Sequence, residues 1–127
     1  MSCTVAQMMV FAIGVLHVLF MLGELFPWNR PIIMGVVLGK WRRPLNLGPN
    51  ETQLLSSVVH NAGIYNGIVA SGLFATFWLG PSAFLIQVVL LTGGIVAGLF
   101  GAATLTRGTI AQALLGAIAL VAVLWRR

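Results

Sequence analysis

Two ionisable side chains, His17 and Glu24, lie in the first apolar stretch of the sequence. They are seven residues apart, close to two helical turns, so they share one helix face and lie about 10 Å apart along the axis. Ionisable groups inside a membrane segment are costly and are therefore candidates for ligand binding or proton exchange. Two structural interpretations compete: Glu24 could pair with an arginine at the membrane surface, and one hydrogen bond could hold His17.

Further polar side chains fall at a similar depth on the neighbouring predicted helices. Counted by helical rise, His60 and Asn61 lie level with His17, and Tyr65 follows one turn further in. Asn61 or Tyr65 is therefore the expected hydrogen-bond partner of His17. The candidate ligand-binding or proton-exchanging residues are His17, Glu24, Asn61, Tyr65, Asn66 and Gln112. Asn66 and Gln112 could instead serve only as hydrogen bonds between helices.

Four apolar blocks are long enough to place these side chains inside a bilayer. A spanning helix needs about 20 mostly apolar residues. The blocks cover residues 4–26, 51–78, 83–105 and 109–125, and the connection 27–50 contains a short apolar stretch expected to lie in the membrane interface. The expected fold is an all-α, integral membrane, four-helix transmembrane bundle, with residues 1–127 forming a single transmembrane domain.

Possible caps mark the starts of these helices. Asn50 with Gln53, and Thr109 with Gln112, have the spacing of a capping box. Both pairs therefore predict a helix start stabilised by its own side chains.

The composition is that of a membrane protein. Apolar residues make up 59% and charged residues 7% of the chain, against about 45–50% and about 25% in soluble domains. A water-soluble globule and a disordered chain are both excluded. The net charge of +5 forms no continuous basic stripe, so no nucleic-acid partner is expected. The single cysteine, Cys3, has no metal-ligand spacing around it, and no metal site is expected.

The distribution of positive charge predicts the membrane orientation. The connections after the first and third blocks carry Arg30, Lys40, Arg42, Arg43 and Arg107, and the other side carries Arg126 and Arg127. Because positive charge is retained in the cytoplasm, both termini are expected outside it, in a multi-pass membrane protein. The bias also allows a dual or reversed topology.

Small residues are spaced for close helix packing. The pairs are Gly63 with Gly67, Gly94 with Gly98, and Ala97 with Gly101. In a membrane such residues let backbones approach one another. The pattern predicts tight packing of this chain's own helices, surrounded by lipid. A homodimer or a larger membrane complex would use the same chemistry.

Three segments resemble a known family. They are LHVLFMLGELFPW (16–28), HNAGIYNGIVASGL (60–73) and VAGLFGAATLTR (96–107), the last followed by AQALLGAIAL. They look like the small bacterial membrane proteins of the domain of unknown function 1304 family, over nearly the whole chain apart from the first connection. The family's recurring features fall on His17, Glu24, Asn61, Gly63, Tyr65, Asn66 and Gly101 to Thr104. The resemblance implies four transmembrane helices in a bacterial inner membrane, and it implies no activity. The family pattern does not call for a histidine at the position of His60.

Functions of three classes are compatible with these residues. The favoured one is binding or transport of a small molecule or ion through a polar, cytoplasm-facing cavity, with His17 and Glu24 exchanging protons. A second is a structural or assembly subunit of a membrane complex.

The third class is a membrane enzyme acting on a lipid-soluble substrate, with His17 as general acid or base. The distance between His17 and Glu24 excludes a direct hydrogen bond, so no catalytic residue is assigned. A cofactor version would use His17 and His60 as axial ligands of a b-type haem. Clustering of the polar residues at one depth favours the binding function.

Overall fold

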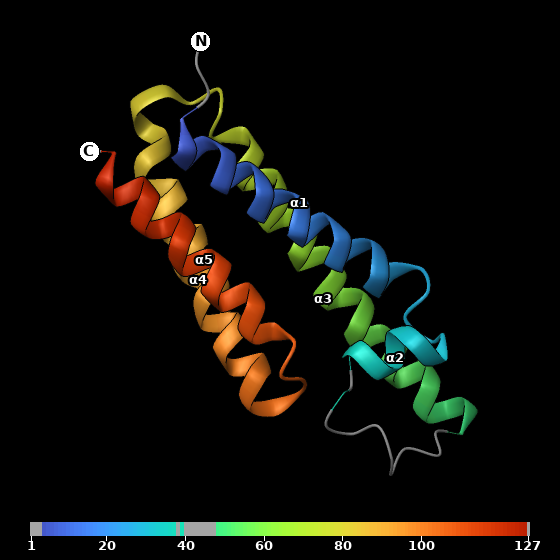
Figure 1. Ribbon diagram of the computed structural model, residues 1–127. Coiled ribbons are helices and arrows are strands. Elements are labelled where there is room, and N and C mark those ends of the chain that lie inside the picture. The colour runs from blue at the N-terminus through green and yellow to red at the C-terminus, as the bar shows by residue number, and fades with distance from the viewer. Residues whose placement is uncertain (1–3, 38, 40–47, 127) are drawn as a thin grey trace.

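The computed structural model describes residues 4–37, 39 and 48–126. In these residues the elements are helical, and they are drawn in Figure 1: α1 (Val5–Leu25), α2 (Pro31–Val37), α3 (Pro49–Ala75), the 3-10 turn η1 (Gly80–Ser82), α4 (Ala83–Thr104) and α5 (Thr109–Trp125). The expected all-α class is confirmed for them. The largest difference from the predicted helix ends is at α3, which ends at Ala75 instead of residue 78.

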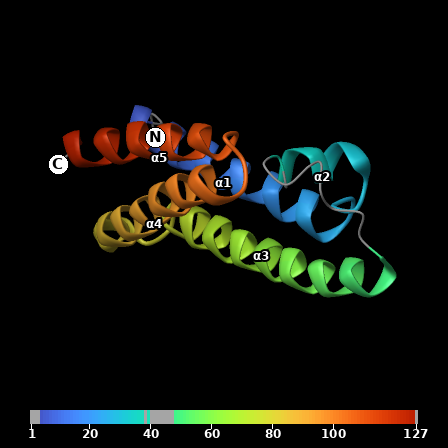
Figure 2. The same ribbon diagram turned by 90° about the horizontal axis from the view of Figure 1, so that it is seen from below.

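The long helices form two antiparallel pairs. α1 packs along α3, and α4 packs along α5, while α1 also contacts α5 and α3 also contacts α4. Figure 1 shows both termini at one end, where the two pairs meet, and shows the pairs separating toward the opposite end. Figure 2 shows α1 and α5 in one layer and α3 and α4 in the other.

The connection between the first two long helices is described only in part. Its residues Pro31–Val37 form α2, near the ends of α1 and α3 that point away from the termini (Figure 1). Lys40, Arg42 and Arg43, which carry much of the predicted positive charge, lie outside the described residues.

The hydrophobic core lies in the half of the bundle nearest the termini. Its buried residues come from all four long helices: Ala6, Val10, Ile13, Leu73, Leu91, Ala119 and Val123. Met9, Phe77 and Phe84 are among the partly buried side chains that pack against it. Burial of this apolar surface holds the two helix pairs together at one end. The more polar residues of α1 and α3 lie toward the other end.

Glycines bring the helices of each pair close together. A Cβ added to Gly63 would lie 3.1 Å from the Leu25 side chain of α1, and a Cβ on Gly67 would lie 2.7 Å from a methionine sulfur of α1. In the other pair, a Cβ on Gly98 would lie 2.8 Å from the backbone nitrogen of Ala113. The predicted packing of small residues against this chain's own helices is confirmed at these positions.

Two helical segments among the described residues are long and apolar enough to cross a membrane. They are Val5–Leu25 and Gly80–Thr104. α5 has 17 residues and is shorter than the usual span. α3 has 27 residues, but its middle carries His60, Asn61 and Asn66. Length and composition thus indicate membrane association through α1 and α4.

The helix caps differ from those expected. α3 begins at Pro49 after Gly48, and α5 begins at Thr109 after Gly108, so the capping boxes predicted at Asn50 and Thr109 are wrong. At α3 the ring of Pro49 already fixes the backbone for the first helical turn. At α5 the hydroxyl of Thr109 donates to the carbonyl oxygen of Thr106 instead.

A capping box does form at the start of α1. The hydroxyl of Thr4 accepts from the backbone nitrogen of Gln7 at 3.3 Å, and the Gln7 side-chain oxygen accepts from the backbone nitrogen of Thr4 at 2.8 Å. Two backbone donors of the first turn are satisfied by this reciprocal arrangement.

We expect Thr4→Ala to fray the first turn of α1 without disturbing the bundle. Loss of a helix cap costs about 1 kcal/mol, so hydrogen exchange at the backbone amide of Gln7 should accelerate roughly fivefold. Hydrogen exchange followed by NMR in micelles measures this rate. Thr4→Ser retains the accepting oxygen and should exchange like the parent, and an unchanged rate in Thr4→Ala would contradict the capping role.

Candidate functional site

Three hydrogen-bonded side chains connect α1 with α3. The Oδ1 atom of Asn66 lies 2.7 Å from Nδ1 of His17, and the Nδ2 atom of Asn66 donates to Oε2 of Glu24 at 2.8 Å. One amide on α3 therefore bridges two side chains that lie two turns apart on the same face of α1. The shared face of His17 and Glu24 is confirmed by this common partner.

The bonds of Asn66 determine which ring nitrogen of His17 carries the proton. An ionised carboxylate can only accept, so Glu24 takes the amide N–H and leaves the amide oxygen facing the imidazole. The neutral ring must then carry its hydrogen on Nδ1, which donates to Asn66, and its Nε2 is an acceptor.

The Nε2 atom of His17 is directed toward α4. It is buried and has no hydrogen-bond partner among the described residues, in a ring that is only 3% exposed. A Cβ added to Gly94 of α4 would lie 3.5 Å from this nitrogen. Buried polar atoms are nearly always hydrogen-bonded, because leaving one unpaired costs about 1–3 kcal/mol. His17 thus has an unused acceptor near the bundle centre.

Gln112 of α5 lies against the same place on α4. Its side-chain nitrogen donates to the carbonyl oxygen of Gly94 at 3.0 Å, and the side chain is buried. Each long helix therefore contributes at least one residue to this region, and α1 contributes two. We call Glu24, His17, Asn66, Gly94 and Gln112 the polar cluster.

Two expected site residues lie outside the polar cluster. Tyr65 is 62% exposed, and Asn61 is also exposed. The expected hydrogen bond from Asn61 or Tyr65 to His17 is therefore wrong, since Asn66 makes it instead. Asn66 was a candidate in the sequence, although its interpretation as a simple contact between helices competed with a functional one.

The register of α1 against α3 explains this difference. The position of a Cβ on Gly63 lies 3.2 Å from Glu24, and that on Gly14 lies 2.5 Å from the ring of Phe74. The N-terminal end of α3 therefore extends several turns beyond the C-terminal end of α1. The depths estimated from the sequence assume that the two helices end at the same level, which misplaces Asn61 relative to His17.

The same register separates the two histidines. His60 lies beyond the Glu24 end of α1, about eleven residues or roughly 16 Å along the axis from the level of His17. Two axial ligands must reach one iron atom from opposite sides. The positions of His17 and His60 do not fit a bis-histidine haem within one chain.

A second buried polar contact joins α3 to α4 near the termini. The side-chain nitrogen of Gln87 donates to the hydroxyl of Thr76 at 2.9 Å, and that hydroxyl donates to the carbonyl oxygen of Leu73 at 2.6 Å. The Oε1 atom of Gln87 is buried without a partner among the described residues. This pair is not among the site residues predicted from the sequence, although a glutamine inside an apolar block is a signal that could have indicated it.

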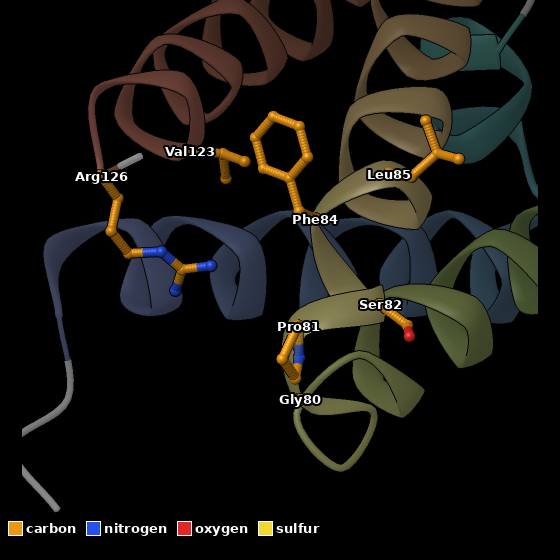
Figure 3. A pocket seen from close by; sticks show the side chains of 7 residues that line it. All are labelled: Gly80, Pro81, Ser82, Phe84, Leu85, Val123 and Arg126. Carbon is orange, nitrogen blue, oxygen red and sulfur yellow. The ribbon is translucent and has the colours of Figure 1, made fainter.

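Three surface pockets lie at the termini end of the bundle. The one in Figure 3, of about 570 Å³, is lined by Gly80, Pro81, Ser82, Phe84, Leu85, Val123 and Arg126. The others have volumes of about 420 Å³ and about 490 Å³. None of these three pockets includes His17, Glu24 or Asn66. The three pockets therefore lie away from the polar cluster, and the cavity predicted from the sequence was expected at the polar cluster.

Comparison with known proteins gives one match. Residues 11–124 match the family model described as "Protein of unknown function (DUF1304)". No curated protein and no solved structure matches the chain significantly. The matched range contains the whole polar cluster.

Proposed function

The chain belongs to the DUF1304 family, and we propose that it is a membrane protein that binds or transports a small molecule or ion at the polar cluster. The observation that carries this proposal is the hydrogen-bonded line from Glu24 through Asn66 to His17, which ends in an unpaired buried acceptor. A histidine that serves only to hold helices together would have both ring nitrogens satisfied inside the bundle. The unpaired Nε2 atom of His17 can instead accept a hydrogen bond from a ligand or bind a proton.

We propose further that α1, α3, α4 and α5 all cross the membrane. Each carries an exposed apolar stripe: Met8, Phe11, Val15 and Leu19 on α1; Leu54, Val58, Ile64 and Ile68 on α3; Leu85, Val89, Val96 and Phe100 on α4; and Ile110, Leu114, Ile118 and Val121 on α5. Soluble proteins rarely expose contiguous apolar surface of this extent, and lipid would cover it. Residues 1–127 would then form a single four-helix transmembrane domain.

The proposed orientation places both termini outside the cytoplasm. Arg30 lies in the connection between α1 and α2, and Arg107 lies in the connection between α4 and α5. Figure 1 shows both connections at the end of the bundle opposite the termini. Positive charge at that end favours the cytoplasmic side. Glu24 would then lie close to cytoplasmic water, with His17 two turns deeper. A half-buried carboxylate in this position could exchange protons with water, and its charge could polarise His17 through the hydrogen bonds of Asn66.

A structural role is the second candidate, and the bonding of Asn66 favours it. The amide uses both its acceptor and its donor in one contact between α1 and α3, as a purely structural residue would. Exposed Asn61 and Tyr65 would suit contacts with a second copy or with a larger membrane complex. An enzyme is less favoured, because the carboxylate of Glu24 does not contact the imidazole directly.

Proton flux into liposomes tests the proposed function. We expect purified protein to accelerate the collapse of an imposed pH gradient, read from an internal pH-sensitive dye with valinomycin and potassium clamping the potential. Glu24→Gln should reduce the flux to nearly that of protein-free liposomes, because the amide cannot release a proton. A glutamine can still accept from Asn66, so the helix contact should persist.

The matched control is Glu51→Gln. Glu51 is an exposed carboxylate in the first turn of α3, outside the polar cluster. This variant should conduct protons like the parent at equal reconstitution. Equal flux in the parent and in Glu24→Gln would reject proton exchange at Glu24 and favour the structural role.

A further inference from the structure

We propose that the termini end of the bundle binds one anionic phospholipid, whose phosphodiester group contacts Arg126 in the pocket of Figure 3. This site shares no residue with the polar cluster, so the inference goes beyond the proposed function. It rests only on the proposal that α4 and α5 cross the membrane, because that places the start of α4 and the end of α5 at the lipid headgroups.

Arg126 is the one charged side chain that lines this pocket. Figure 3 shows its guanidinium extending from the end of α5 toward the turn between α3 and α4. The chain has two acidic side chains, Glu24 and Glu51, and they lie at the opposite ends of α1 and α3. No acidic side chain of the protein is thus near Arg126, and its guanidinium can bind an external phosphate through two parallel hydrogen bonds.

The turn between α3 and α4 leaves room for a headgroup beside Arg126. The hydroxyl of Ser82 makes no capping hydrogen bond to α4, so it can donate to a phosphate oxygen. A Cβ on Gly80 would meet no atom within 4 Å. The pocket volume of about 570 Å³ lies within the range of about 300–1,000 Å³ that is usual for small-molecule sites.

Arg126 also lines a second pocket, formed by residues of α1 and α5. This pocket has a volume of about 420 Å³, and its other lining residues are Thr4, Val5, Ala6, Ile118, Val121, Ala122 and Trp125. All of these except Thr4 are apolar. The first pocket also has apolar walls, which are formed by Phe84, Leu85 and Val123. One cation therefore lies between two apolar pockets, as the phosphate of a phospholipid lies above two acyl chains.

The surface around Arg126 has the character of a membrane interface. Trp78 and Trp125 are 81% and 89% exposed at this end of the bundle, and tryptophan is enriched at membrane–water boundaries. Ile118 of the second pocket lies about 12 Å along α5 from Arg126, toward the membrane interior. The apolar pockets thus extend toward the acyl chains. A soluble phosphodiester has no chains to fill them, so the arrangement favours a lipid.

Native mass spectrometry of the full chain in a mild detergent tests this site. We expect one tightly bound phosphatidylglycerol per chain, with an affinity roughly fivefold above that of phosphatidylcholine with the same acyl chains, because the choline cation opposes Arg126. Glycerophosphoglycerol has the same headgroup without acyl chains, and it should not bind at the same concentration.

Two glutamine variants locate the lipid. Arg126→Gln should bind phosphatidylglycerol no better than phosphatidylcholine. Arg107→Gln is the matched control, because it removes the same charge from an exposed position in the connection between α4 and α5, at the opposite end of the bundle, and it should bind like the parent. Equal affinities of the parent for the two lipids, parent-like binding by Arg126→Gln, equal losses in both variants, or binding of glycerophosphoglycerol as tight as that of phosphatidylglycerol would overturn the inference.

Carbonate extraction of the protein from liposomes tests the membrane-spanning premise separately. Protein that stays in the membrane but shows no preference for phosphatidylglycerol rejects the lipid site and leaves the crossing helices in place. Protein that carbonate extracts rejects both. The dependence of proton flux on Glu24 is a third, independent result, since no residue of the two pockets belongs to the polar cluster.

Discussion

Asn66→Leu is expected to cause the largest loss of stability of any single substitution in the polar cluster. It removes both hydrogen bonds between α1 and α3 and leaves the carboxylate of Glu24 and Nδ1 of His17 facing an apolar side chain. Hydrogen bonds between membrane helices average about 0.6 kcal/mol, whereas stranding a buried polar group costs about 1–3 kcal/mol. We expect the free energy of unfolding to fall by about 2 kcal/mol. Unfolding by sodium dodecyl sulfate in mixed micelles measures this change.

Asn61→Leu is the matched control on the same helix. It makes the same chemical change at an exposed position without a hydrogen bond to α1, so it should leave the free energy of unfolding nearly unchanged. Equal stabilities of the two leucine variants would show that the line from Glu24 to His17 does not hold α1 against α3. Asn66→Leu should also lose the Glu24-dependent proton flux, and Asn61→Leu should retain it.

The helices of this protein could be predicted from the sequence because hydrophobicity sets them locally. Each predicted block contains a helix, and the start of α4 at Ala83 and both ends of α5 match the prediction. The common face of His17 and Glu24 also follows from the helical period alone. Caps were predicted less well, since Pro49 and Gly108 define helix starts where side-chain caps were expected.

The partner of His17 could not be predicted because it depends on how far one helix slides along another. The contacts of Gly14 with Phe74 and of Gly63 with Leu25 define that register, and GxxxG spacing does not say which residues will face a glycine. A slide of a few residues exchanges Asn61 for Asn66 as the nearest amide. The unpaired Nε2 beside Gly94 depends on a third helix and is still further from any local sequence pattern.

Gly98→Leu is expected to separate α5 from α4. Even a Cβ at this position would lie 2.8 Å from the backbone nitrogen of Ala113 and 2.9 Å from the carbonyl oxygen of Thr109. These are backbone atoms of α5, so they cannot rotate away as the end of a flexible side chain would. Replacing glycine by alanine inside a helix usually stabilises it by about 0.5–1 kcal/mol, but overpacking costs about 1–3 kcal/mol. We therefore expect Gly98→Ala to be destabilising and Gly98→Leu to be more so.

The effect of Gly98→Leu should extend to the polar cluster. Gln112 is the residue before Ala113, and its hydrogen bond to Gly94 lies one turn from the disturbed contact. Moving α5 outward would remove this donor from the carbonyl oxygen of Gly94, so the hydrogen bond between α5 and α4 should be lost together with stability. Gly93→Ala is the control, because its methyl group meets no atom within 4 Å. A Gly98→Leu variant as stable as Gly93→Ala would contradict close backbone packing of α4 on α5.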